Sequence, residues 1–138
     1  MAKKINIMGR DLSTCEALIM RIVWDSEENI SVPELIATLS KEYGRDYART
    51  TVVTFLERLR NKGYVETYRA GRISYVKVVK SKESYLDDFL SDVTDFWYGG
   101  HTEMFVKALF EAKAPTPSER IQIRNLLDKL ETQGNRGK

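Results

Sequence analysis

The side chains that most often carry covalent or metal chemistry are scarce in this sequence. It has one histidine, His101, and one cysteine, Cys15. Neither belongs to a Cys/His cluster with metal-ligand spacing, and the sequence has no glycine-rich phosphate loop or Gly-x-Ser-x-Gly motif. Cys15 falls on an apolar helical stripe, and His101 follows Gly99-Gly100, where a helix can begin. We therefore expect no enzyme, no metal site and no cofactor.

A different chemistry is offered by residues 49–61, RTTVVTFLERLRN. Their apolar residues recur at helical spacing and predict one buried helix face, which leaves hydroxyl side chains outward at the helix start. Threonine hydroxyls can hydrogen-bond to base edges, and threonine or valine methyls can contact a thymine methyl. The alternative is that a threonine merely caps the helix. The candidates for base contact are Arg49, Thr50, Thr51, Val53 and Thr54.

Positive charge is concentrated around the same helix. Residues 41–80 have ten basic and four acidic side chains, whereas the segments before and after each have a net charge of −2. A local positive field favours a polyanionic partner; a solvated basic face without a partner is the alternative. The acidic Glu57 opposes phosphate contact, so we expect the helix to leave a DNA groove from there onward. The candidates for backbone contact are Lys41, Arg45, Arg58, Arg60, Lys62, Arg69, Arg72 and Lys77.

Three helices and a hairpin are predicted in the first eighty residues. Apolar residues at i, i+3, i+4 and i+7 begin at Cys15, Val32 and Val52. The first two helices also have Ser-x-x-Glu start signals at 13–16 and 31–34. Segments 64–69 and 73–79 are rich in β-branched and aromatic residues and flank a turn at 70–72. This order predicts a mainly α (α+β) winged helix-turn-helix domain, whose third helix enters the major groove.

The second half predicts a helical arm. Helical apolar spacing resumes after residue 81, breaks at Gly99-Gly100, and ends with a helix opened by a capping box at 116–119. We expect a DNA-binding domain at 1–80 and a dimerisation domain at 81–138, because a short arm has too many large apolar side chains to hide alone. The alternative is that the arm folds back on its own domain. The candidate dimer-interface residues are Phe89, Val93, Phe96, Trp97, Met104, Phe105, Leu109, Leu126, Leu127 and Leu130.

Several segments resemble the penicillinase repressor family of the BlaI/MecI type. They are LSTCEALIMRIVW at 12–24, SVPELIATLS at 31–40, RTTVVTFLERLRNKGYV at 49–65 and the Tyr98-Gly99-Gly100 sequence. The resemblance covers residues 10–132. It implies a dimeric winged-helix repressor that binds a palindromic DNA operator and blocks transcription, controlling genes such as those of antibiotic resistance.

Two departures from the family concern the signal that relieves repression. Family members are inactivated by a sensor protease that cuts an Asn-Phe bond, and the matching position here is Ala108-Leu109. Copper-responsive relatives have a cysteine-rich C-terminus, whereas this chain has no cysteine after Cys15. A sensor protease is thus a partner that the resemblance implies and that the residues at 108–109 do not support.

Two other functions stay open at the level of sequence. One is a winged-helix module that binds proteins and not DNA, against which the basic segment 41–80 argues. The other is a repressor induced directly by a small ligand, which the aromatic run Phe96-Trp97-Tyr98 suggests. The single cysteine and the lack of an apolar run of about 18 residues predict a cytoplasmic protein with no membrane partner.

Overall fold

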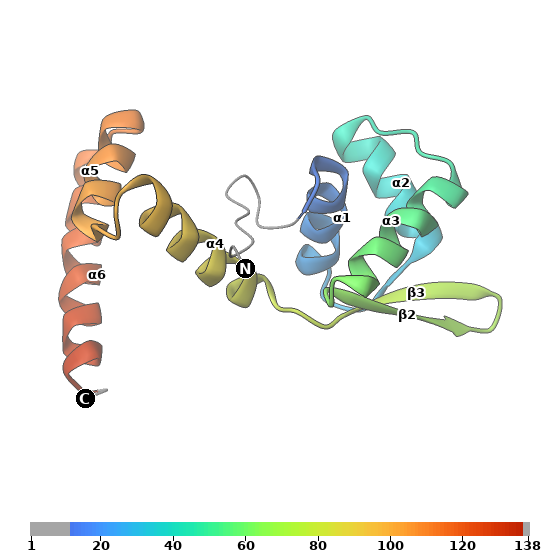
Figure 1. Cartoon of the computed structure of the whole chain (residues 1–138). Coiled ribbons are helices and arrows are strands. Elements are labelled where there is room, and N and C mark those ends of the chain that lie inside the picture. The colour runs from blue at the N-terminus through green and yellow to red at the C-terminus, as the bar shows by residue number, and fades with distance from the viewer. Residues whose placement is uncertain (1–11, 137–138) are drawn as a thin grey trace. The chain divides into compact units, whose positions relative to one another are not determined.

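The computed structural model describes residues 12–136, which form two compact units with the boundary between Val93 and Thr94. The boundary lies inside a helix, whereas the sequence predicted domains of 1–80 and 81–138, a functional division that stays a proposal. The elements, drawn in Figure 1, are α1 (Thr14–Asp25), β1 (Ile30–Ser31), α2 (Val32–Tyr43), α3 (Arg49–Asn61), β2 (Val65–Ala70), β3 (Ile73–Val78), α4 (Lys82–Trp97), α5 (Thr102–Ala112) and α6 (Pro117–Arg136).

Helices α1 and α2 begin where their capping signals predicted. The Ser13 hydroxyl accepts from the Glu16 backbone N–H at 3.2 Å, and the Glu16 carboxylate accepts from the Ser13 N–H at 2.8 Å. The Ser31 hydroxyl accepts from the Glu34 N–H at 3.2 Å. These bonds satisfy N–H groups that have no partner within the helix. The predicted starts are therefore confirmed.

The apolar stripes of α1, α2 and α3 meet in one core. Its fully buried side chains come from all three helices and from the strands that follow; they include Ile19, Leu35, Leu39, Val52, Leu59 and Val76. Each of these helices is amphipathic, and the helical spacing predicted from the sequence places the same residues inward. As a result, the opposite face of α3 is left toward solvent.

Cys15 lies at the edge of this core and not in its centre. Its side chain is half-buried, and its Sγ lies 2.8 Å from the hydroxyl of Tyr47 in the loop before α3. The hydrogen bond with Cys15 raises the pKa of the Tyr47 hydroxyl. Tyr47 in turn packs edge-on against Phe55 of α3, with ring centroids 5.5 Å apart. Cys15 thus helps to hold the loop that leads into α3.

The sheet has three antiparallel strands in the order β1-β3-β2. Strands β2 and β3 form the predicted hairpin, and Ala70 pairs with Ile73 across a turn in which Gly71 has a φ of +67°. That left-handed conformation costs a residue with a Cβ more than it costs glycine. We call this hairpin, residues 65–78, the wing. Figure 1 shows it projecting beyond α1, α2 and α3.

Strand β1 was not predicted. It has only two residues, which pair with Val76 and Tyr75 of β3. The adjacent Asn29 donates from Nδ2 to the hydroxyl of Tyr68 at 3.0 Å, and the Tyr68 ring stacks on Tyr75. These contacts attach the base of the wing to the segment between α1 and α2.

The first half of α4 belongs to the core of the first unit. Trp24 donates from Nε1 to the backbone oxygen of Lys80 at 2.9 Å, and its ring lies 5.3 Å from that of Tyr85. Tyr85 is buried, and Phe89 stacks on it and packs against the same core. Phe89, a predicted dimer-interface residue, therefore already packs within its own chain.

The second unit has helices but no fully buried side chain among its described residues. The predicted capping box of α6 is present, because Thr116 and Glu119 exchange side-chain to backbone hydrogen bonds of 2.9 and 3.1 Å. Leu126, Leu127 and Leu130 are each more than half exposed. A cluster of large exposed apolar side chains normally marks an interaction surface.

A buried ion pair ties the start of α1 to the end of α3. The Glu16 carboxylate is only 2% exposed, and the Lys62 Nζ donates to its two oxygens at 2.9 and 3.1 Å. Burial raises the pKa of this carboxyl. The hydrogen bonds from Lys62 and Ser13 outweigh that effect and leave the pKa below its ordinary value of 4.5. Glu16 is therefore charged at neutral pH and depends on Lys62.

We predict that Lys62→Met destabilises the first unit by about 2 kcal/mol, because it leaves a buried carboxylate without its cation. Urea unfolding followed by circular dichroism measures the change. Lys41→Met is the matched control, since Lys41 is exposed at the end of α2. Equal stability of the two variants would show that the ion pair does not stabilise the fold.

Candidate nucleic-acid interface

The outward face of α3 has the predicted base-contacting residues. Arg49, Thr50 and Thr54 are exposed, and Val53 is 45% exposed. Thr51 is half-buried on the flank of the helix. Four of the five predicted residues are therefore exposed, and short side chains among them would allow a close approach to a groove floor.

The threonines do not cap the helix, so that alternative is excluded. The N-cap residue is Ala48, and no described side chain accepts a capping hydrogen bond there. The Thr54 hydroxyl donates instead to the backbone oxygen of Thr50 at 2.9 Å. Because its proton is used within the helix, the Thr54 oxygen faces outward as an acceptor, beside its methyl group.

The start of α3 is suited to an anion. Its first turn has no acidic residue, and Arg49 is exposed there. The first backbone N–H groups of a helix have no partner within the helix, and they add to the positive end of its dipole. Phosphate contact at this end is thus electrostatically favourable, as is usual for helix N-termini.

The two faces of the wing separate the predicted basic residues. Arg69 pairs with Ser74 and therefore shares a face with Thr67, whereas Lys77 pairs with Glu66 on the opposite face. At the tip, Arg69 donates from Nη2 to the backbone oxygen of Arg72 at 3.2 Å. Arg69 and Lys77 therefore lie on opposite faces of the wing, and Arg69 is bonded to the tip.

A cavity of about 280 Å³ lies between α3 and the wing. Val53, Glu57 and Arg60 line it from α3, and Thr67 and Ser74 line it from the wing, with Val32 and Leu56 completing the wall. Sequence reasoning missed Thr67 and Ser74. The alternation of the strands could have found them, since they lie on the same face as Arg69. Thr67 and Ser74 of the wing thus share a cavity with exposed residues of α3.

The other predicted backbone contacts are distributed around this face. Lys41 and Arg45 are exposed at and after the end of α2. Arg58 is exposed, with its guanidinium 6.0 Å from the Phe55 ring centroid. Lys62, by contrast, binds Glu16 inside the fold. Its role as a phosphate contact stays a prediction, but its ammonium is already engaged.

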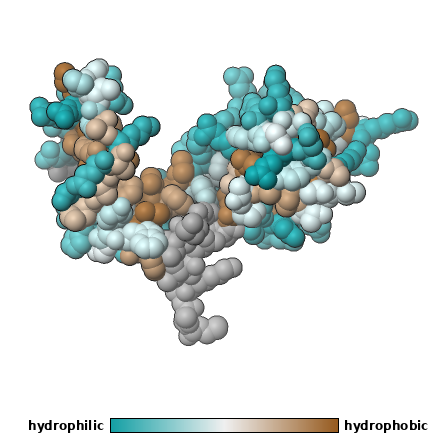
Figure 2. Space-filling view, turned by 90° about the horizontal axis from the view of Figure 1, so that it is seen from above, coloured by the Kyte–Doolittle hydropathy of each residue, from teal (hydrophilic) through white to brown (hydrophobic). Residues whose placement is uncertain are grey.

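Exposed apolar side chains gather on the second unit. Figure 2 shows brown apolar patches over its helices. Phe96 and Trp97 pack edge-on with ring centroids 4.9 Å apart, yet they are 49% and 60% exposed. Of the other predicted interface residues, Val93 and Phe105 are half-buried, whereas Met104, Leu109, Leu126, Leu127 and Leu130 are exposed.

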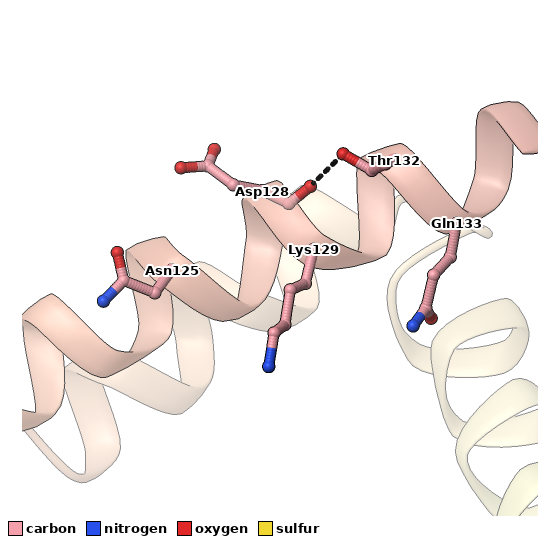
Figure 3. A pocket seen from close by; sticks show the side chains of 5 residues that line it. All are labelled: Asn125, Asp128, Lys129, Thr132 and Gln133. Carbon is pink, nitrogen blue, oxygen red and sulfur yellow. Dashed lines mark hydrogen bonds between the residues drawn. The ribbon is translucent and has the colours of Figure 1, made fainter.

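Two hollows in the second unit bear on the small-ligand alternative. One, of about 380 Å³, is lined by Phe110, Ala114, Pro115, Arg120, Ile123, Arg124 and Leu127, and not by the aromatic run 96–98. The other is lined by polar side chains along one face of α6 and has no opposing wall (Figure 3). Neither encloses a ligand site around the residues that suggested one.

The helices and acidic side chains of residues 12–136 bear on membrane and metal binding. Each helix there is too short or too polar to cross a lipid bilayer. This part of the chain contains no group of three or more His, Cys, Asp or Glu side chains placed to hold a metal ion. His101 is exposed at the start of α5, with Nδ1 3.4 Å from the Glu103 carboxylate.

Several solved structures are similar to this chain. The DNA-binding domain of the repressor BlaI is 27% identical, with a TM-score of 0.47, over 54% of this chain and 88% of that domain. RosR of H. salinarum is 16% identical, with a TM-score of 0.51, over 91% of this chain and 98% of RosR, and it shares the fold. FabT of Streptococcus pneumoniae, solved in complex with DNA, is 21% identical, with a TM-score of 0.44, over 93% of this chain and 79% of FabT. No curated protein sequence gave a match.

The sequence of this chain matches a known protein family. The penicillinase repressor family matches residues 12–129, which include α1, the wing and most of α6. This match agrees with the resemblance found in the segments at 12–24 and 49–65. The chain therefore belongs to the penicillinase repressor family, and it is a winged-helix DNA-binding transcriptional regulator and not an enzyme.

Proposed function

We propose that this regulator is a homodimeric repressor that reads a palindromic operator through α3. The observation that supports this most directly is the outward face of α3, where Thr50 and Thr54 are exposed and neither caps the helix. Their hydroxyl and methyl groups would meet base edges in the major groove, with Arg49 at a phosphate or a guanine. Val53 would add an apolar contact to a thymine methyl, and Thr51 would contact the groove from the flank.

The wing would hold the DNA backbone beside α3. Arg72 at its tip and Arg69 behind it offer guanidinium groups, and phosphate contacts of this kind fix the register without reading the sequence. Arg60 in the cavity and Lys41, Arg45 and Arg58 around α3 would extend the same contact. Because Lys77 lies on the other face of the wing, we expect it to contribute least.

The arm would form the dimer. A two-fold dimer presents two copies of α3 and therefore requires a two-fold symmetric DNA site. The exposed apolar side chains of α5 and α6 support this, because burial against a second copy would remove them from water. The second unit has no described buried side chain of its own, so it gains more from a partner than a self-sufficient domain would.

Antibiotic-resistance genes are the targets that membership of the family suggests. Release by a sensor protease would require a cleavable bond at the position where this chain has Ala108-Leu109. The Ala108-Leu109 bond lies in the middle of α5, and cleavage of a helical bond requires local unfolding.

Thr54→Ala should weaken binding to a selected operator about ten-fold, because it removes an acceptor and a methyl from the groove face. Fluorescence anisotropy with labelled operator and with random DNA measures the change. Thr132→Ala is the matched control, since Thr132 is an exposed helical threonine whose hydroxyl donates to Asp128 in the same way (Figure 3). An operator affinity equal to that of the control would exclude base reading by Thr54.

Arg72→Ala should weaken the binding of operator and random DNA by similar factors and reduce the salt slope of log K by about 1, as loss of one phosphate contact requires. Titrations at several salt concentrations give both values. A change confined to sequence preference, with the slope intact, would show that the wing tip reads bases.

Leu130→Asp should weaken the dimer on the order of 100-fold, because a charge would enter an apolar interface. Sedimentation at several concentrations measures the dissociation constant. Asn125→Asp adds the same charge on the polar face of α6 (Figure 3) and should leave the dimer intact. If both variants sediment like the wild type, α6 does not form the interface.

A further inference from the structure

The carboxylate of Glu57 lies on the DNA-facing side of α3. It follows Val53 by four residues and Thr54 by three, so it shares their helix face. Its side chain is exposed and makes no hydrogen bond or ion pair with any residue that the structure describes. Arg60, one turn further along, lines the same cavity without pairing with it. Glu57 is therefore an available acceptor on a surface that otherwise suits an anion.

An acidic side chain on such a surface needs a donor. DNA phosphates are acceptors only and repel a carboxylate, so phosphate contact cannot satisfy Glu57. In the major groove the donors are the exocyclic amino groups, N4 of cytosine and N6 of adenine. Adenine presents its N7 acceptor beside the N6 amino group. N7 would face the second carboxylate oxygen, and two acceptors repel each other. Cytosine presents no acceptor of its own there, so it is the better partner.

The position of Glu57 along α3 fits a base next to those met by Thr54. Three residues of helix advance about 4.5 Å, which is comparable to the spacing of stacked base pairs. On the wing side, the Thr67 and Ser74 hydroxyls line the cavity shared with Glu57 and add no cation there. The wing residues that line this cavity therefore do not neutralise the carboxylate.

We propose that Glu57 is a specificity-determining residue that accepts a hydrogen bond from the N4 amino group of a cytosine in each half-site. The inference rests on the proposed placement of α3 in the major groove. It revises the expectation that the helix leaves the groove at Glu57. Thymine and guanine at this position would place carbonyl oxygens against the carboxylate and would be rejected.

Selection from random duplex DNA with the full chain tests this assignment. The wild type should enrich sites with a fixed cytosine in each half-site. Glu57→Gln should shift that single position toward adenine, because an amide can both donate to N7 and accept from N6. Glu57→Ala should lose the preference there, with about ten-fold less discrimination in anisotropy and stronger binding to random DNA. Glu27→Gln and Glu27→Ala, in the exposed loop after α1, are the matched controls.

The outcomes separate this inference from the function on which it rests. If Glu57→Gln and Glu57→Ala both enrich the wild-type site with unchanged discrimination at every position, Glu57 does not read a base, while the repressor assignment stands. If the wild type enriches no sequence at all, the proposed operator reading and this inference both fail. Equal unfolding curves for wild type and variants exclude misfolding as the cause of a changed site.

Discussion

The buried carboxylate of Glu16 is the interaction on which the geometry of the DNA-binding unit depends. It closes the first turn of α1 through Ser13 and binds the ammonium of Lys62 just after α3. A charge so deeply buried is tolerated only when it is paired, so the ion pair fixes where α3 ends relative to α1. Val52 and Leu59 of α3 then pack into the core, and the face of Thr50 and Thr54 is left outward.

The two units differ in how much apolar surface they bury. In the first, α1, α2, α3 and the sheet enclose a core, and Tyr85 and Phe89 of α4 extend it. In the second, the helices bury no described side chain fully. The first unit therefore folds around its own core, whereas the second leaves large apolar side chains such as Trp97 and Leu127 exposed.

Much of this arrangement is visible in the sequence, because it depends on local signals. Capping residues such as Ser13 and the helical spacing of Val52 and Leu59 define helix starts and faces without knowledge of the fold. Contacts between distant residues are not visible in this way. Lys62 is 46 residues from Glu16, so its basic charge suggested phosphate contact, and its buried partner was missed. Strand β1 has two residues, too few to show the alternation of apolar and polar residues that predicts a strand. Its pairing with β3 defines it.

A crystal structure of the full chain bound to a DNA site selected from random duplexes tests the central claim most directly. We expect two copies on a two-fold site, with the first half of α3 in the major groove and Thr50 and Thr54 against base edges. The wing of each copy should lie on the phosphate backbone. A complex in which the Thr50 face of α3 points away from the DNA, or in which one copy binds alone without symmetry, would contradict it.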